Sequence, residues 1–137
     1  MQKTKNKVII DTNILISFLL SKQNSKFDSI FAHNKITLVF SSQLLEEFLT
    51  VTGRNKFKKF FDLKDVENLI LKIRNRGIFV EVTSKVKICR DAKDNFLLAL
   101  ALDSKATHLI TGDKDLLVLK KIGKTEIITL ADYLKGK

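Results

Sequence analysis

The chain has 137 residues, of which 45% are hydrophobic, and this suits one domain with a sizeable buried core. No apolar run approaches the roughly 20 residues needed to cross a bilayer. The basic N-terminal segment leads into an apolar run too short for a signal-peptide core, so we expect a cytoplasmic protein. The single cysteine, Cys89, excludes an internal disulfide, and no Cys or His cluster near it suggests a zinc site.

The formal net charge of +10 is the first indication of function. A basic surface attracts polyanions, and nucleic acid is the commonest polyanion in the cytoplasm. The same charge also follows from a Lys-rich composition that only keeps the protein in solution. Charge alone therefore leaves both interpretations open.

The first half of the chain alternates short apolar runs with helical patterns. Residues 8–10 are a continuous apolar run typical of a strand buried on both faces, and residues 36–40 are the second strand. We expect helices over residues 13–20 and 26–33, and a third that begins after an N-cap at Ser42.

The second half continues the alternation. A helix over residues 63–74 is expected to end at Gly77 as a C-terminal glycine, and the helix over residues 94–102 is apolar on most sides. Strands are predicted at 78–82, 109–110 and 127–128, a short helix at 115–119, and a last helix at the C-terminus. No linker or repeat divides residues 1–137. The pattern predicts one α/β domain with a mainly parallel sheet and helices on both faces.

Four acidic residues fall where such a sheet forms its sites, beyond the carboxyl ends of the strands. Asp11 follows the first strand and Asp113 the fourth, while Glu47 and Asp94 lie on helices that begin after strands. Crowded carboxylates repel one another, so a chain with 25 basic residues tolerates them only if a cation compensates. Oxygen ligands suit Mg²⁺ or Mn²⁺, ions that assist phosphodiester hydrolysis.

Each acid also has a purely structural interpretation. Asp11 could cap the helix that follows it, Asp94 could be an ordinary N-cap, and Glu47 could be a solvated helix-face residue. Asp113, which follows a glycine, could be a turn residue. Taken singly these are weak signals, and their order along the chain makes them more specific.

Four motifs resemble the ordered motifs of the PIN-domain family, and the match spans essentially the whole chain. They are Ile-Ile-Asp-Thr-Asn at 9–13, Ser-Ser-Gln-Leu-Leu-Glu-Glu-Phe at 41–48, Asp-Ala-Lys-Asp-Asn-Phe-Leu-Leu-Ala-Leu-Ala at 91–101, and Leu-Ile-Thr-Gly-Asp-Lys-Asp-Leu-Leu at 109–117. The first and last motifs are specific, and the one containing Glu47 is looser. Within the family the chain looks most like the VapC-like toxins of toxin–antitoxin pairs.

The resemblance implies a three-layer α/β/α sandwich with a five-stranded parallel sheet. It also implies an Mg²⁺- or Mn²⁺-dependent endoribonuclease acting on RNA, commonly a homodimer inhibited by a small antitoxin protein. The family's catalytic and metal-binding acids correspond to Asp11, Glu47, Asp94 and Asp113, with Asp115 as an additional metal ligand.

Two supporting residues and two choices between neighbours also come from the resemblance. Asn13 and Thr111 match polar residues that steady the first and last Asp. Glu47 is preferred to Glu46 because it keeps the family's spacing from Ser41, and Asp94 is preferred to Asp91 because of its distance from the Ala pair at 99 and 101. Asp91 is the alternative to Asp94.

Basic and aromatic residues alternate between Arg54 and Phe61 (Arg54, Lys56, Phe57, Lys58, Lys59, Phe60, Phe61). Such a mixture can hold single-stranded nucleic acid, although burial of the Phe residues in a hairpin or dimer contact is the favoured interpretation. Arg90 and Lys93 lie nearest the acids in sequence, and they are the predicted phosphate contacts. His33 and His108 are expected to be structural.

Two other classes of function remain open on the sequence. A non-cutting RNA-binding module would keep the fold and use only its basic face, although the complete set of acids argues against it. A metal-dependent phosphatase or phosphotransferase would use Asp11 as a nucleophile. That chemistry usually needs a second Asp two positions later, where this chain has Asn13. The sequence around Ser17 and Cys89 does not support a covalent mechanism.

Overall fold

The computed structural model describes residues 6–20, 36–54 and 62–135. The helix expected at 26–33, His33, and residues 56–61 of the basic and aromatic segment lie outside these ranges. Within the described residues, no helix is long and apolar enough to cross a membrane.

Three parallel strands form the centre of the sheet: β1 (Asn6–Ile10), β2 (Ile36–Phe40) and β4 (His108–Ile110). β1 lies between the other two, with Val8 opposite Leu38 of β2 and Ile10 opposite Ile110 of β4. The apolar residues of these three strands are buried, because helices cover both faces of the strands. The strand positions expected from apolar runs are confirmed here.

The complete sheet has the strand order β3-β2-β1-β4-β6-β5. β3 (Gly77–Phe79) is one edge, and β6 (Thr125–Ile128) pairs in parallel with β4. The sixth strand, β5 (Lys121–Ile122), pairs antiparallel with β6. The expectation of five strands was therefore wrong by one. β5 has only two residues in a hairpin that turns at Gly123, whose φ is +57°, and so short a segment has no apolar run to reveal it.

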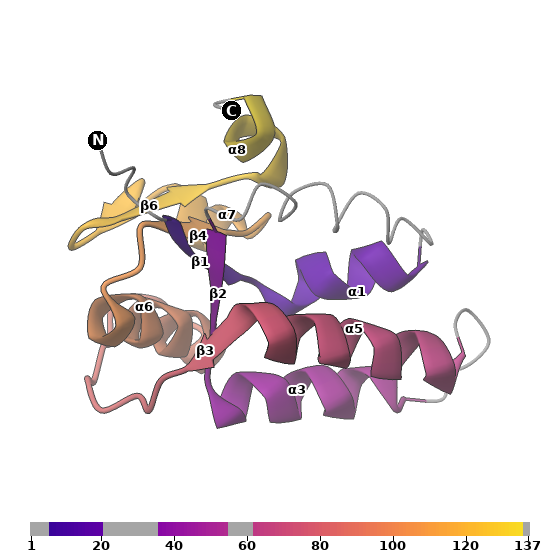
Figure 1. The fold of residues 1–137 in the computed structure, drawn as a ribbon. Helices are drawn as coiled ribbons and strands as arrows, with labels where there is room; N and C mark the ends of the chain where they lie inside the picture. Colours follow the sequence, from indigo (N-terminus) through magenta and orange to yellow (C-terminus); the bar gives the residue numbers. More distant parts are fainter. Residues whose placement is uncertain (1–5, 21–35, 55–61, 136–137) are drawn as a thin grey trace.

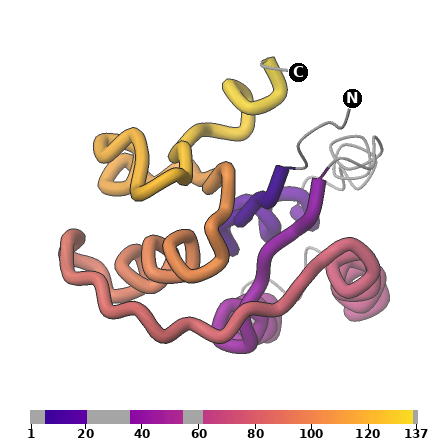
Figure 2. The backbone as a smooth tube through the Cα atoms, turned by 60° about the vertical axis from the view of Figure 1, so that its left-hand side comes forward, coloured from indigo at the N-terminus to yellow at the C-terminus, as the bar shows by residue number. Residues whose placement is uncertain are grey.

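Helices lie on both sides of the sheet, as predicted. α1 (Thr12–Leu20) packs against α3 (Ser42–Thr52), and α5 (Leu63–Arg76) packs against β2 and β3. Figures 1 and 2 both show α6 (Ala92–Ser104) on the opposite side of β1 and β2 from α5. This arrangement is the expected three-layer α/β/α sandwich.

Two short helices complete the fold at the C-terminal end. α7 (Lys114–Leu117) packs against β6, and α8 (Leu130–Lys135) places the buried Tyr133 over the sheet. The Tyr133 hydroxyl accepts a hydrogen bond from Asn6 Nδ2 at 3.1 Å, which ties α8 to the start of β1. His108 packs edge-on against the Tyr133 ring, with 5.0 Å between the ring centroids. This contact agrees with the structural role expected for His108.

Two helices, α3 and α6, begin at residues other than those expected from the sequence. Ser41, not Ser42, is the N-cap of α3, since its Oγ accepts the Leu44 amide at 3.0 Å. Asp91 is the N-cap of α6, where it accepts the Lys93 amide at 2.9 Å. Asp94 is therefore not a cap, and it lies in the first turn of a helix that begins at Ala92.

Gly77 has a role different from the one predicted. It follows α5 with φ −116° and ψ 161°, which is extended backbone rather than the left-handed turn of a C-terminal glycine. A Cβ at this position would lie 2.5 Å from the Ile73 carbonyl oxygen, so only glycine allows the helix to pass directly into β3. β3 ends at Phe79, three residues before the predicted end of the strand at residue 82.

Candidate metal centre

The acidic residues gather at the carboxyl ends of β1 and β4. Since Ile10 is opposite Ile110, the residues that follow them, Asp11 and Thr111, leave the sheet side by side. The Asp11 amide donates to the Ile110 carbonyl at 3.0 Å, so the pairing continues one step past the strands. Strand register alone thus positions the first predicted acid.

Asp11 is almost completely buried at 9% exposure. Its Oδ2 accepts the Thr111 hydroxyl at 2.8 Å and its Oδ1 accepts the Asn13 backbone amide at 3.2 Å. Burial raises the pKa of Asp11, the two hydrogen bonds oppose that rise, and the charges of Glu47 and Asp113 add to it. The carboxylate is therefore fixed in position, and these two hydrogen-bond donors are neutral groups.

Thr111 connects the first and the last predicted acids. Its hydroxyl donates to Asp11 and accepts the Asp113 backbone amide at 3.1 Å. Asp113 in turn caps α7, with Oδ1 accepting the Asp115 amide at 2.9 Å. The turn interpretation of Asp113 thus describes its capping role, and the same carboxylate also lies beside those of Asp94 and Asp115.

Three carboxylates form the tightest acidic group among the described residues. Asp94, Asp113 and Asp115 each offer one oxygen, and these oxygens all lie within 4.8 Å of one another. Asp94 is 5% exposed, and its Oδ2 is buried with no hydrogen-bond partner in the described part of the chain. The pKa of Asp94 is raised to about 7, first by burial and then by the hydrogen bond and the negative charge of the adjacent Asp113.

An orphaned carboxylate oxygen beside two other carboxylates fits a bound divalent cation. A buried polar atom without a partner costs free energy, and an ion that contacts all three acids would satisfy it while cancelling their repulsion. Oxygen-only ligands suit a hard ion such as Mg²⁺ or Mn²⁺. We refer to Asp94, Asp113 and Asp115 as the carboxylate group.

Glu47 lies outside the carboxylate group and has a different environment. Its Oε2 is 2.6 Å from Lys93 Nζ, and its Oε1 accepts the Thr12 hydroxyl at 3.4 Å. The hydrogen bond to Glu47 raises the pKa of Lys93, which stabilises the ammonium form of this side chain. Glu47 contributes to the raised pKa of Asp11, which places both acids within electrostatic reach of each other.

The two predicted phosphate contacts are both paired with acids in the structure. Lys93 binds Glu47, and Arg90 approaches Asp115 Oδ2 at 3.3 Å. Arg90 is 90% exposed and Lys93 62% exposed, so solvent screens both pairs and each base can exchange partners at small cost. They stand at the rim of the acidic site rather than inside it.

Sequence reasoning missed two residues that shape the site. Thr12 holds Glu47, and Asn95 fixes the segment that leads to Arg90. The Asn95 carboxamide accepts the Ile88 and Cys89 amides at 3.0 and 2.7 Å and donates to the Cys89 carbonyl at 2.9 Å. A lone amide at the start of an otherwise apolar helix was the available signal. The rejected alternatives are Glu46, which is exposed, and Asp91, which caps α6.

Comparison with known proteins shows a family match over most of the chain. The family model described as PIN domain matches residues 7–115. An uncharacterized protein of Methanocaldococcus jannaschii is 34% identical over 130 residues, which cover 90% of this chain and 81% of that protein. No solved structure matches the chain.

Proposed function

Because the chain belongs to the PIN-domain family, we propose that residues 1–137 form one nuclease domain, a metal-dependent endoribonuclease that hydrolyses RNA phosphodiester bonds. The observation that carries the proposal is the carboxylate group, whose most buried member, Asp94, has an Oδ2 atom without a hydrogen-bond partner among the described residues. A buried carboxylate without a partner costs free energy of folding, and a bound cation would offset that cost.

The metal would be held by Asp94, Asp113 and Asp115, with Asp11 and Glu47 completing the acidic rim. A bound Mg²⁺ or Mn²⁺ supplies Lewis-acid activation of water and stabilises charge on the phosphate and on the leaving oxygen. Thr111 keeps Asp11 and Asp113 in fixed relative positions through its two hydrogen bonds. Fixed ligands matter because a misplacement of about 1 Å can cost a hundredfold in rate.

Lys93 and Arg90 are proposed to bind the phosphates of the RNA strand on either side of the acids. Each is exposed and paired with one acid in the free protein. A phosphate oxygen is an equally good partner for either base, and its arrival leaves the acids free for the ion. The charge of +10 attracts the polyanion to this rim from a distance.

The proposal extends to a toxin role with a small antitoxin protein as partner and a homodimer as the active assembly. The resemblance to VapC-like ribonucleases supports this finer assignment. Expression of the chain in bacteria is expected to arrest growth, and expression of Asp94→Asn is not. Light scattering of the purified protein is expected to report the mass of two chains. If the purified protein is a monomer and its expression leaves growth unaffected, the toxin role is wrong, whereas the nuclease proposal still stands.

The test of the nuclease is cleavage of a mixed RNA pool with Mg²⁺, with Mn²⁺ and with EDTA, beside the Asp94→Asn variant. Calorimetric titration with Mn²⁺ gives a second readout that does not depend on catalysis. We expect metal-dependent cleavage and saturable Mn²⁺ binding in the wild type, and neither in the variant. RNA binding without cleavage and without metal binding would establish a non-cutting RNA-binding module instead.

A further inference from the structure

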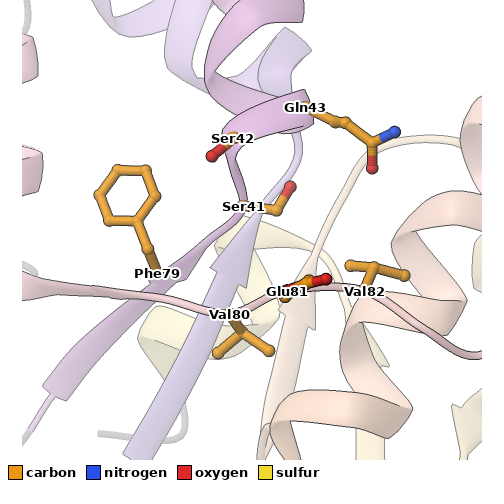
Figure 3. Close-up of a pocket in the computed structure, with 7 residues that line it drawn as sticks. All are labelled: Ser41, Ser42, Gln43, Phe79, Val80, Glu81 and Val82. Carbon is orange, nitrogen blue, oxygen red and sulfur yellow. The ribbon is translucent and has the colours of Figure 1, made fainter.

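A cavity of about 490 Å³ opens at the carboxyl ends of β2 and β3, beside the start of α3. Figure 3 shows Ser42 and Gln43 on the first turn of α3, and Phe79 and Glu81 on the segment that runs past it. The lining residues are Ser41, Ser42, Gln43, Phe79, Val80, Glu81 and Val82. A cavity of this size is suited to a small organic group.

The cavity and a hollow beside the acidic site share one lining residue, Gln43. This smaller hollow is also lined by Glu47, Ala92, Lys93 and Phe96. Gln43 and Glu47 are four residues apart on α3, so their side chains lie on the same face, separated by one helical turn of about 5.4 Å. A strand whose phosphate reaches Glu47 and Lys93 would therefore bring its neighbouring nucleotide to the cavity.

The charge of the cavity excludes a phosphate as its occupant. Among the described residues, its lining includes no Lys or Arg, although the chain carries 25 of them, and it includes the exposed carboxylate of Glu81. A carboxylate repels phosphate and accepts hydrogen bonds from N–H groups. Within a nucleic-acid strand, the cavity is therefore matched to a base that presents N–H donors and not to a phosphate.

Phe79 adds an aromatic surface to one side of the cavity. It is 46% exposed on an edge strand, where a large apolar side chain is usually buried or absent. The fully buried Phe40 supports it from within, with 6.2 Å between ring centroids and an interplanar angle of 51°. The Val80 amide donates to the Phe40 carbonyl at 2.8 Å and holds the backbone beside the ring. A supported, exposed ring suits stacking of a nucleobase.

We propose that this cavity receives one unpaired guanine base of the RNA strand, stacked on Phe79, with Glu81 accepting hydrogen bonds from the guanine N1–H and N2–H₂ groups. Guanine is the base that presents two adjacent N–H donors to a carboxylate, and its O6 accepts from an amide such as that of Gln43. Ser41 is occupied in capping α3, which leaves Ser42, Gln43 and Glu81 as the polar contacts. This inference rests on the proposed function, since it assigns the specificity of the same site.

The experiment measures binding of fluorescent hexaribonucleotides in EDTA, where no cleavage occurs. Each hexamer is oligouridine with a single internal guanosine, adenosine or cytidine. We expect the guanosine hexamer to bind the wild type at least about tenfold more tightly than the other two. Phe79→Leu should weaken its binding about 5- to 100-fold, the range measured for loss of one base–aromatic stack. Phe79→Tyr keeps the ring and should retain the affinity.

Glu81→Gln is the matched test of base identity, since it keeps the shape of the side chain and removes its charge. It should abolish the preference for guanosine over adenosine while leaving stacking intact. Leu71→Ala, which removes an exposed apolar side chain from α5, is the control and should change nothing. Equal binding of the three hexamers, or a Phe79→Leu variant that binds as the wild type does, would overturn the inference.

The same variants separate this inference from the proposed function. A wild type that cleaves RNA with a sequence preference unchanged in Phe79→Leu and Glu81→Gln is a nuclease without this subsite. A wild type that does not cleave, yet binds the guanosine hexamer through Phe79, retains the subsite and loses the nuclease. Guanosine monophosphate is expected to bind far more weakly than the hexamer, and equal affinity would contradict an RNA strand as the occupant.

Discussion

The carboxylate group and the Glu47–Lys93 pair share one rim of the sheet, but their charges are balanced in different ways. Asp94 is buried, its Oδ2 has no partner in the described structure, and its pKa is raised to about 7. Glu47 is accompanied by an ammonium group at 2.6 Å and by the Thr12 hydroxyl. The protein thus pairs Glu47 with Lys93 and the exposed Asp115 with Arg90, whereas the structure gives the buried Asp94 no such ion pair among the described residues. An external ion is therefore expected first at the carboxylate group.

Removal of the Asp94 charge should produce the largest change. Asp94→Asn is expected to weaken Mn²⁺ binding, and to slow RNA cleavage, by at least about a hundredfold, because the deepest of the three ligand oxygens becomes a neutral amide. Calorimetry and a gel-based cleavage assay measure the two effects. Asp132→Asn, an exposed Asp on α8, is the matched control and should behave as the wild type. Full Mn²⁺ affinity in Asp94→Asn would place the ion elsewhere.

Loss of the Thr111 hydroxyl should disturb the buried side of the rim. Thr111→Val keeps the shape but removes the donor to Asp11 and the acceptor for the Asp113 amide. We expect the free energy of unfolding to fall by about 1–3 kcal/mol, since a buried carboxylate loses a hydrogen bond. Urea denaturation measures this change, and Thr111→Ser should largely restore stability. An unchanged Thr111→Val protein would show that water replaces the hydroxyl.

The pH dependence of stability distinguishes the two kinds of acid directly. A folded-state pKa raised from 3.8 to about 7 means that the folded protein binds the Asp94 proton more tightly than the unfolded chain. The stability of the metal-free protein should therefore fall as pH rises from about 4 to 7. Asp94→Asn removes this loss, so it should be more stable than the wild type by about 1–3 kcal/mol at pH 8.

The difference between the two proteins should vanish near pH 4, where Asp94 is protonated in the wild type. Saturating Mn²⁺ should reverse the order at pH 8, because only the wild type binds the ion. Urea denaturation in EDTA across this pH range measures the effect. A metal-free Asp94→Asn protein less stable than the wild type at pH 8 would contradict the raised pKa.

Removal of the internal cation should have the smallest effect. Lys93→Gln leaves Glu47 unpaired, so the rim gains negative charge and the affinity for Mn²⁺ should rise about two- to fivefold. Because Lys93 is 62% exposed, solvent keeps the change small. RNA binding should weaken, and the slope of the logarithm of the binding constant against the logarithm of salt concentration should decrease by about 1, the value for one phosphate contact. A Lys93→Gln protein with unchanged salt dependence would remove Lys93 from the phosphate contacts.

Local sequence patterns were sufficient for much of the fold. The apolar runs of β1 and β2 and the apolar helix α6 are buried as predicted, because burial on both sides leaves no room for polar residues. β5 was missed because two residues carry no periodicity. The positions of the caps at Ser41 and Asp91 were also missed, since neighbouring Ser and Asp residues are equally good caps in sequence.

Local sequence is enough to place acidic residues after the strands of a parallel sheet, and this predicts a metal-binding site at their carboxyl ends. The division of the acids into two groups depends on tertiary packing. Asp94, Asp113 and Asp115 converge from α6 and α7, whereas Glu47 on α3 meets Lys93 across the rim. Tertiary packing also decides the position of Phe79, which lies on an edge strand and is supported by Phe40. Such distances depend on how the helices pack on the sheet, and no local pattern in the chain encodes them.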